Sequence, residues 1–315
     1  MGGQAALARR MALAAAAFAS LPGPSVAAEH LSAAQTISLP FTSRSTGLNG
    51  AFGAVPGGLS SLNFNPAGLY VLKKVGASQA TALFSPVGAG GAEEALGYAQ
   101  RLQKIILAAG YLGYNDPLRE PSSGVLARNA STALLNVAFP MGEGLWGGVQ
   151  ARGLDVDSLE DGAAQGYDAG AGLLWDAPVE GLTLGASFQN VGPALRFSGT
   201  SIDLPQQARA GAAYDWRYPF GVPLLVLATA DGIKPRGGPY GELSGLQISG
   251  GSARGMQTLV EGGVSLAGAS HSASMGFGMA YKSRWTLDYS FTFNNGGLSP
   301  LNTITIGCRF RSGKK

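Results

Sequence analysis

One stretch near the C-terminal end of the chain alternates strictly between apolar and polar residues. Its odd positions are Trp285, Leu287, Tyr289, Phe291 and Phe293, and its even positions are Thr286, Asp288, Ser290 and Thr292. A β-strand has a period of two residues, so this pattern gives one aromatic-rich face and one hydrophilic face. Residues 273–281 and 304–310 repeat it. Repeated segments of about ten residues with this alternation are the signature of a transmembrane β-barrel, because a tilted strand of that length crosses a bilayer.

The rest of the chain divides into segments of similar length and pattern. We expect fourteen antiparallel strands, at residues 75–85, 93–102, 104–114, 127–139, 144–154, 166–176, 182–190, 206–216, 222–231, 245–252, 257–267, 272–282, 284–295 and 302–311. The alternation is weak in 93–102, 222–231 and 245–252, so twelve strands are an alternative. The number is even because both chain ends return to the same side of the membrane. Longer, polar loops are expected on the extracellular side, at 155–165, 191–205 and 232–244.

The first 28 residues have the three parts of a secretory signal peptide. Arg9 and Arg10 precede an apolar run over residues 11–21, and the small residues Ala27 and Ala28 provide a cleavage site. The run is too short to span a membrane as a helix. We therefore expect residues 1–28 to be removed after export, and the mature chain to lie in the lipid of the outer membrane of a Gram-negative-type bacterium.

The composition agrees with a barrel that faces lipid, and the charge balance of the mature chain does not point to a nucleic-acid partner. Cleavage after residue 28 lowers the basic residues from 22 to 20, against 19 acidic residues, so a nucleic-acid partner is not expected. Charged residues make up only 13% of the chain, which suits a surface that faces lipid. The lone Cys308 allows no disulfide within the chain, and the alternation places it on the lipid face.

The segment before the first expected strand, residues 29–74, has no strand-like alternation. It contains two blocks, Gly50-Ala51-Phe52-Gly53-Ala54-Val55 and Phe64-Asn65-Pro66-Ala67-Gly68-Leu69. Proline fixes its own φ and keeps the preceding residue out of helical geometry. Asn65-Pro66 therefore predicts a tight turn, in which the asparagine amide caps backbone groups that water does not reach. Taken alone, the segment is a Gly/Pro-rich loop with one or two short helical turns.

The two blocks resemble the opening motif of the PorV/PorQ family and of the related FadL long-chain fatty-acid transporters. Phe64 stands where tryptophan is usual in these families. Further matches follow in the family's order at 168–173, 184–192, 204–211 and 287–289, so the resemblance covers roughly residues 45–310. It implies a fourteen-stranded barrel whose N-terminal segment folds into the lumen as a plug, with apolar contacts from Phe52, Phe64 and Leu69. We therefore divide the mature chain into a plug segment (29–74), a barrel (75–311) and a basic tail (312–315).

The sequence offers little for catalysis. Of the two histidines, His30 lies beside the expected new N-terminus and His271 lies in a turn before a strand. No Gly-x-Ser-x-Gly elbow occurs, and no residues have the spacing of a zinc site. We expect no enzymatic activity, no cofactor and no metal, with a serine paired to His271 as the remaining alternative.

The hydrophilic strand faces carry a set of charged residues, Arg152, Asp168, Arg209, Glu261, Asp288 and Arg309. We interpret them as paired, solvated residues that brace the barrel and the plug, and a polar path for a solute is the functional alternative. Aromatic residues near strand ends, Tyr167, Trp175, Trp285, Phe293 and Phe310, are expected to form girdles at the membrane interfaces.

Two functions follow from the resemblance. A PorV/PorQ-type barrel acts in protein secretion, where it handles exported cargo and contacts secretion-system proteins through its extracellular loops. A FadL-like importer takes up hydrophobic small molecules such as long-chain fatty acids, and movement of the plug opens their path. The loops expected here are short and polar, which disfavours a hydrophobic capture surface. The secretion-associated role is therefore our first prediction, and the importer is the alternative.

Overall fold

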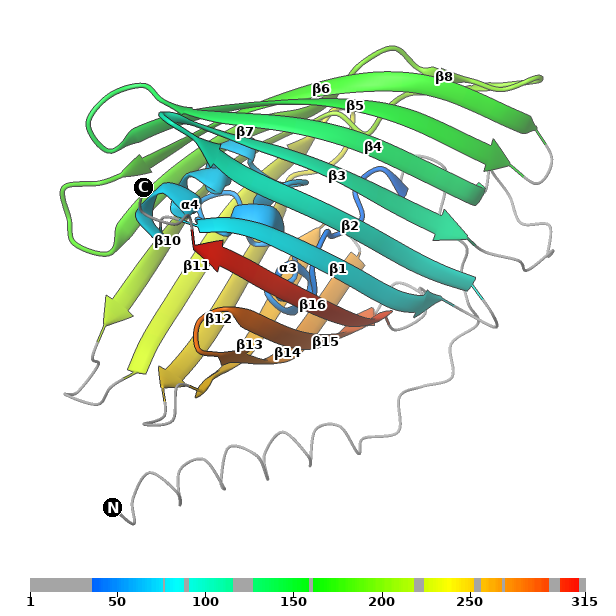
Figure 1. The fold of residues 1–315 in the computed structure, drawn as a ribbon. Helices are drawn as coiled ribbons and strands as arrows, with labels where there is room; N and C mark the ends of the chain where they lie inside the picture. Colours follow the sequence, from blue (N-terminus) through cyan, green and yellow to red (C-terminus); the bar gives the residue numbers. More distant parts are fainter. Residues whose placement is uncertain are drawn as a thin grey trace.

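The computed structural model describes residues 36–75, 77–87, 91–115, 127–158, 161–217, 224–251, 256–267, 270–294 and 301–311. Its main sheet is a closed antiparallel barrel of fourteen strands around a lumen (Figure 1). The strands are β1 (Ala77–Val87), β2 (Gly91–Leu102), β3 (Ile105–Asn115), β4 (Ala127–Pro140), β5 (Leu145–Ser158), β6 (Gly162–Asp176), β7 (Leu182–Val191), β10 (Gln207–Arg217), β11 (Leu224–Pro235), β12 (Gly241–Gly251), β13 (Met256–Ala267), β14 (Ser270–Tyr281), β15 (Trp285–Asn294) and β16 (Leu301–Arg311). Between β7 and β10, the two-residue strands β8 (Leu195–Arg196) and β9 (Ser201–Ile202) form a separate hairpin.

The barrel has the predicted fourteen strands rather than twelve. Two of the three predicted long loops are wrong. Strands β5 and β6 occupy most of residues 155–165, and β11 and β12 occupy both ends of 232–244. Asp155 and Asp157 are outward residues of β5. We mistook this polar stretch for a loop, but it is the end of a strand that extends beyond the apolar outer band. The expected signal peptide (1–28), His30 and the basic tail (312–315) lie outside the described residues.

Alternate residues of each strand point outward and inward, as the sequence predicts. The outward positions expose large apolar side chains, including Leu96, Leu135, Leu173, Leu287 and Ile306. The aromatic residues expected in girdles are outward as well: Tyr167, Trp175, Trp285 and Phe310 each expose a large part of their surface. This apolar outer belt is the surface that a membrane-spanning barrel presents to lipid.

Cys308 lies on the outer face of the barrel, as predicted, but its neighbours cover it almost completely. Cys308 is outward in register, yet only 7% of its surface is exposed. Trp285 is its direct partner on the neighbouring strand, and both line a shallow apolar hollow of about 590 Å³ with Tyr98 and Ile306. The bulky neighbours cover the small thiol, so Cys308 acts as an apolar filler of the outer wall.

The last strand closes the barrel against the first. Ser78 is opposite Phe310 and Phe84 is opposite Ile304 in the antiparallel ladder between β1 and β16. Both the start of β1 and the end of β16 lie at the same end of the barrel, which we assign to the periplasmic side.

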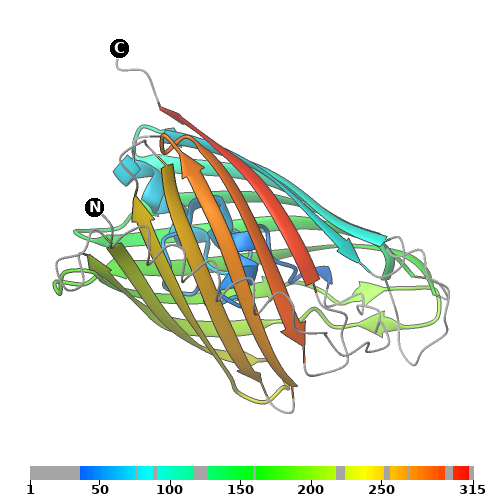
Figure 2. The same cartoon turned by 90° about the horizontal axis from the view of Figure 1, so that it is seen from below.

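Residues 36–75, here called the luminal segment, lie inside the barrel. They form the helix α3 (Ser43–Gly47), the 3-10 helices η1 (Gly58–Ser61) and η2 (Pro66–Tyr70), and the helix α4 (Val71–Val75). Figure 2 shows the helices at the start of this segment inside the wall, and α4 lies at one end of the barrel (Figure 1). No helix of the described residues is long and apolar enough to cross a membrane. The luminal segment contributes most of the largest fully buried side chains of the protein, among them Phe41, Phe52 and Leu69.

Replacing Ile306 with arginine is expected to destabilise the barrel in lipid. Ile306 lies at the middle of β16 and exposes 55% of its surface outward. Arginine at such a position costs about 2–4 kcal/mol at the bilayer midplane, because its charge loses water. Urea unfolding of the protein in vesicles measures the effect, and the variant Ile306→Val should be close to wild type. Equal stability of the arginine variant would show that this face is not in contact with lipid.

Candidate binding lumen

The luminal segment rests on glycines of the barrel wall. Gly148 of β5 and Gly185 of β7 both point inward, and each lies against backbone rather than side chains. A methyl group built on Gly148 would lie 2.3 Å from the backbone nitrogen of Ala67, and one built on Gly185 would lie 2.1 Å from the carbonyl oxygen of Gly53. These distances are far below van der Waals contact, so only glycine allows the segment to approach the wall this closely.

Asn65 fixes the turn that the sequence predicts. Its backbone is extended (φ −154°), and its side-chain oxygen accepts a hydrogen bond from the Ala67 N–H, which caps η2 with Pro66 in the first helical position. The amide nitrogen donates to the carbonyl oxygen of Gly53 at 2.7 Å and to that of Leu173 in β6 at 3.0 Å. One fully buried side chain therefore joins the turn, the preceding loop and the wall.

The variants Asn65→Ala and Asn65→Asp separate the two roles of this side chain. Alanine removes the cap and the donor bonds, at a cost of about 1–3 kcal/mol. Aspartate keeps the acceptor for Ala67 but turns a carboxylate oxygen towards carbonyl oxygens, so we expect it to be less stable than alanine. Unfolding in urea measures both. If aspartate were as stable as asparagine, the donor bonds to Gly53 and Leu173 would not matter.

Two aromatic rings and a buried ion pair hold the centre of the luminal segment. The rings of Phe52 and Phe64 are 5.8 Å apart, and the guanidinium of Arg209 lies 5.1 Å from the centre of the Phe64 ring. Arg209 in β10 also pairs with Asp231 in β11 at 3.0 Å, and Asp231 accepts the backbone N–H of Gly53 at 2.6 Å. The ion pair is thereby tied to the luminal segment as well as to the wall.

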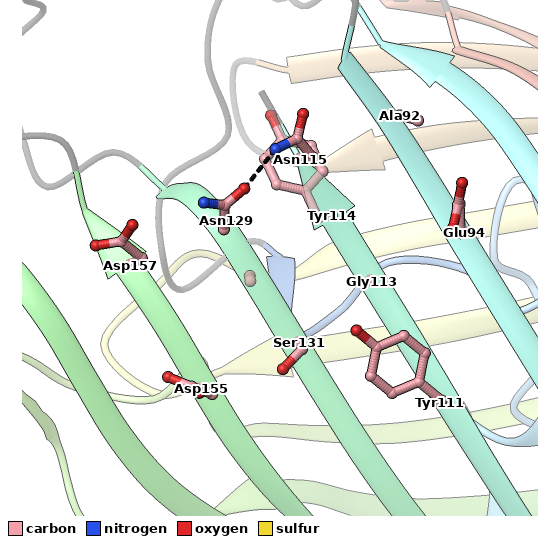
Figure 3. A pocket seen from close by; sticks show the side chains of 11 residues that line it. Ala92, Glu94, Tyr111, Gly113, Tyr114, Asn115, Asn129, Ser131, Asp155 and Asp157 are labelled. Atoms are coloured by element: carbon pink, nitrogen blue, oxygen red, sulfur yellow. Dashed lines mark hydrogen bonds between the residues drawn. The ribbon is translucent and has the colours of Figure 1, made fainter. Parts of the chain in front are cut away.

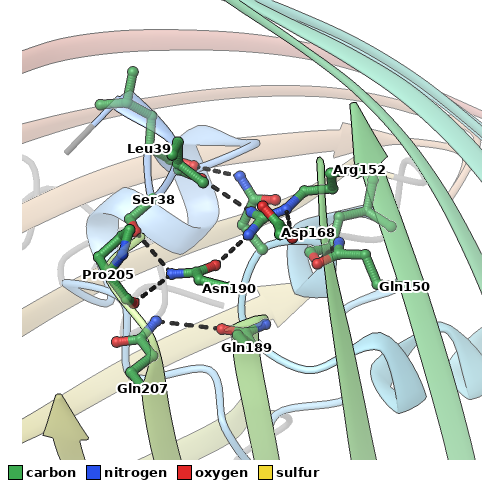
Figure 4. Close-up of polar contacts among 12 residues, drawn as sticks. Ser38, Leu39, Gln150, Arg152, Asp168, Gln189, Asn190, Pro205 and Gln207 are labelled. Carbon is green, nitrogen blue, oxygen red and sulfur yellow. Dashed lines mark hydrogen bonds and ion pairs between the residues drawn. The ribbon is translucent and has the colours of Figure 1, made fainter. Parts of the chain in front are cut away.

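A second buried ion pair lies towards the other end of the luminal segment (Figure 4). Arg152 in β5 and Asp168 in β6 are direct partners across the strands, with Nε and Oδ1 2.8 Å apart. Arg152 also donates to the carbonyl oxygen of Ile37 at 3.0 Å and to the side chain of Asn190. Asn190 has a positive φ of 61° at an irregularity of β7, and its amide donates to the carbonyl of Pro205. From the sequence we expected a paired but solvated arrangement. The pairing is present, but the pair is buried because the luminal segment covers it.

The wall beneath α3 is polar. Ser43 of α3 bonds to the hydroxyl and backbone of β16, and Arg44 donates from its Nε to Gln247 in β12 at 2.9 Å. Arg44 also interacts electrostatically with Glu261 and Asp288, two inward carboxylates of β13 and β15. Glu261 is fully enclosed and neither of its carboxyl oxygens has a hydrogen-bond partner. The structure therefore places all six charged residues that we predicted for the inner face inward. Among the described residues, Arg152 with Asp168 and Arg209 with Asp231 form close ion pairs, whereas Glu261, Asp288 and Arg309 do not.

The opposite wall is apolar, which the sequence analysis missed. Inward positions of β3–β6 towards the extracellular end carry buried apolar side chains, namely Leu112, Tyr114, Ala130, Leu134, Leu154, Val156 and Ala164. The region of the hairpin β8–β9 adds Leu195, Phe197 and Leu204, and the luminal segment adds Ile37, Leu39 and Phe41 to the same cluster. In β3 and β4 the outward positions are largely apolar as well, so the contrast that marks the inner face elsewhere is lost, and at the end of β5 it is inverted because Asp155 and Asp157 point outward. Towards the extracellular end, β3–β6 therefore present an apolar patch to the lumen, although the same strands also carry the inward pair Arg152 and Asp168.

The outer surface of the same strands becomes polar at their extracellular end. A hollow of about 510 Å³ there is lined by Glu94, Asn115, Asn129, Asp155 and Asp157, among others, and Asn115 donates to Asn129 (Figure 3). Carboxylates do not face hydrocarbon without a large cost. The ends of β2–β5 therefore project beyond the membrane, which identifies the side opposite the chain ends as extracellular.

No protein-family model matches the chain, and no curated protein matches its sequence. Solved structures do match over nearly their whole length. The chain is similar to the CymD monoaromatic hydrocarbon channel, with a TM-score of 0.62, 11% identity, and coverage of 87% of this chain and 99% of that one. For the toluene transporter TbuX of Ralstonia pickettii the values are 0.57, 14%, 86% and 98%. For the toluene transporter TodX of P. putida they are 0.58, 11%, 87% and 99%.

These neighbours are channels and transporters rather than enzymes. They share the barrel and its overall size with this chain, at a sequence identity that demonstrates only the fold. The specific resemblance to PorV/PorQ receives no support from them. By its fold, the chain is a closed, fourteen-stranded antiparallel β-barrel of the outer membrane, similar in structure to solved hydrocarbon channels and transporters.

Proposed function

We propose that this barrel imports small hydrophobic molecules across the outer membrane, with residues 29–74 as its plug and 75–311 as its wall. The observation that carries the proposal is the apolar inner wall of β3–β6. The lumen of a porin is polar because water fills it. Leucine, valine and phenylalanine at inward positions suit a molecule that leaves water on its way through the barrel.

The printed ligands of the structural neighbours support the same class of molecule, since these proteins are described as monoaromatic hydrocarbon and toluene transporters. The importer, the alternative in our sequence analysis, is thereby favoured over the secretion role. Within the described residues we find no feature that favours handling of exported proteins. Partners are then the membrane lipid and a hydrophobic small molecule.

In this proposal Phe52, Phe64 and the run from Asn65 to Leu69, here called the plug motif, attach the plug to the wall. Phe52 and Phe64 pack together, and the run Asn65-Pro66-Ala67-Gly68-Leu69 sits against the inward glycines. Asp168, Arg209, Glu261 and Asp288 are the polar wall residues around it. Opening requires the segment to shift, because its side chains and those of the wall fill the lumen between them.

Uptake by whole cells tests the proposal. A bacterial host whose own FadL-type channel is deleted would express this chain or carry an empty vector, and uptake of labelled toluene and labelled oleate would be measured. We expect faster toluene uptake with the chain, and little change for oleate because the apolar patch is confined to the extracellular end of β3–β6. Equal toluene uptake with and without the chain would overturn the proposal.

A reversible lock tests the movement of the plug. Ser43 and Thr305 have their hydroxyl oxygens 2.8 Å apart, so cysteines at both positions, with Cys308→Ala, should form a disulfide between α3 and β16. Toluene uptake should fall when this variant is oxidised and recover on reduction. The matched control is Cys308→Ala alone, which should not respond to the oxidant. Unchanged uptake by the locked variant would show that α3 stays in place during transport.

A further inference from the structure

One row of inward side chains crosses from the polar to the apolar side of the lumen. The ladders pair Ser85 of β1 with Glu93 of β2, and Glu93 with Tyr114 of β3. The same row continues from Tyr114 to Ala130, from Ala130 to Val156, and from Val156 to Ala164. All of these residues are buried. A carboxylate, a hydroxyl and a phenol ring therefore adjoin an apolar surface at one level of the barrel.

The polar end of the row extends onto the two preceding strands. Thr303 of β16 is opposite Ser290 of β15. The pairing of Phe84 with Ile304 puts Thr303 level with Ser85, the next residue along β1. Glu93, Ser85, Ser290 and Thr303 thus form a continuous group on four neighbouring strands, which we call the Glu93 group.

The Glu93 group has unused hydrogen-bonding capacity. Glu93 is 0% exposed and neither carboxyl oxygen has a partner. The hydroxyl oxygens of Ser85, Ser290 and Thr303 also have none, although each residue is at most 1% exposed. Enclosing a carboxyl group without a hydrogen bond is costly, and each buried hydroxyl adds to that cost. A polar ligand group that donates hydrogen bonds would relieve it.

We propose that the Glu93 group binds the polar group of an amphipathic small molecule, a hydrophobic amine or alcohol, whose apolar body lies against Ala130, Val156 and Ala164. This deepens the proposed function and rests on it, because Ala130, Val156 and Ala164 belong to one apolar cluster with Ile37, Leu39 and Phe41, and the luminal segment has to shift before a ligand takes its place. The Glu93 carboxyl group accepts hydrogen bonds and, once ionised beside a bound cation, pairs with it, and the hydroxyls accept or donate. A plain hydrocarbon leaves the group without partners, and a fatty acid can join Glu93 only by sharing a proton between two enclosed carboxyl groups, which leaves one buried negative charge without a cation.

Four probes with one ring separate these possibilities: benzylamine, benzyl alcohol, toluene and benzoate. Binding of each labelled probe to the full mature chain in lipid nanodiscs would be measured by equilibrium dialysis against empty nanodiscs. We expect benzylamine and benzyl alcohol to bind about tenfold or more tightly than toluene, the size of effect of one hydrogen bond to a charged group. Benzoate should bind most weakly of the four.

Two substitutions and a matched control test whether the Glu93 side chain causes the preference for the amine and the alcohol over toluene. Glu93→Gln keeps the shape and an acceptor, so it should lose most of the preference for the amine and less of that for the alcohol. Glu93→Leu should lose both preferences and leave toluene binding unchanged or stronger. Glu94→Gln, one residue along the same strand but outward, should behave as wild type. The shift in mobility of the unboiled barrel on a denaturing gel would show that each variant is folded.

The outcomes distinguish this inference from the proposed function. If toluene is taken up by cells but wild type binds it as tightly as benzylamine, the inference is wrong and the channel remains. The inference is also wrong if Glu93→Leu retains the preference for the amine. If no probe binds and toluene uptake is absent, both fail.

Discussion

Replacing Gly148 with valine is expected to push the luminal segment away from the wall and open the barrel to ions. The new side chain would meet the backbone of Pro66 and Ala67, where even a single methyl carbon would lie within 2.4 Å of both residues. Backbone cannot yield as a flexible side chain can, so the turn at Asn65 has to leave its place. Overpacking of this kind costs about 1–3 kcal/mol or more of unfolding free energy. Conductance of single barrels in planar bilayers measures the opening.

The same strand offers a matched control. Gly153 of β5 points outward, and nothing lies within 4 Å of the position that its side chain would take. Gly153→Val should keep both the stability and the closed lumen of the wild type. Deletion of residues 47–70 should give a conductance at least as large as that of Gly148→Val. If the wild type already conducts as much as the deletion, the luminal segment is not a plug.

Breaking the ion pair between Arg209 and Asp231 is expected to cause the largest loss of stability. Arg209→Met would leave Asp231 enclosed without its cation, and removing one partner of a buried pair costs about 3–5 kcal/mol. The loss should spread to the luminal segment, because Asp231 also holds the N–H of Gly53 and Arg209 donates to the carbonyl of Gly50. Urea unfolding in vesicles and single-barrel conductance measure the two consequences.

A double substitution distinguishes the loss of the ion pair from the cost of leaving one buried charge without its partner. Arg209→Met with Asp231→Leu removes both charges, so much of the stability should return, since an apolar pair needs no solvation. Lys234→Met, on the same strand as Asp231 but exposed, should change stability by less than about 0.5 kcal/mol. If Arg209→Met proved as harmless as Lys234→Met, the ion pair would contribute nothing to the plug or the wall.

The sequence predicts the strands and their faces well, because alternation is a property of each strand alone. It also predicts the turn at Asn65, since proline restricts the residue before it. It does not predict which strands meet in register. Asp231 was assigned to the end of a weak strand, and nothing within that strand indicates that it faces Arg209 and the N–H of Gly53.

The apolar side of the lumen was missed for a related reason. Leu154 and Val156 lie next to Asp155 and Asp157, so the pattern there is apolar inward and polar outward, the inverse of the pattern in lipid. We interpreted that stretch as a loop. Glu93 and Glu94 are adjacent acids in a weakly patterned segment, and only the burial of one and the exposure of the other distinguishes them. Such positions are defined by what packs against the strand, which a period of two does not contain.

The contact between Ser43 and Thr305 bears on how the barrel assembles. The two residues are 262 positions apart, and Ser43 precedes the first strand of the chain. Since β1 and β16 seal the cylinder beside this contact, the final seam must form around a segment that is already in position. Residues 36–75 then act as an internal template around which the sheet closes, and their size sets the circumference of the barrel. Contacts this distant in sequence form slowly, so we expect the pairing of β1 with β16 to limit the rate of insertion. This pairing should be faster once residues 36–75 are ordered.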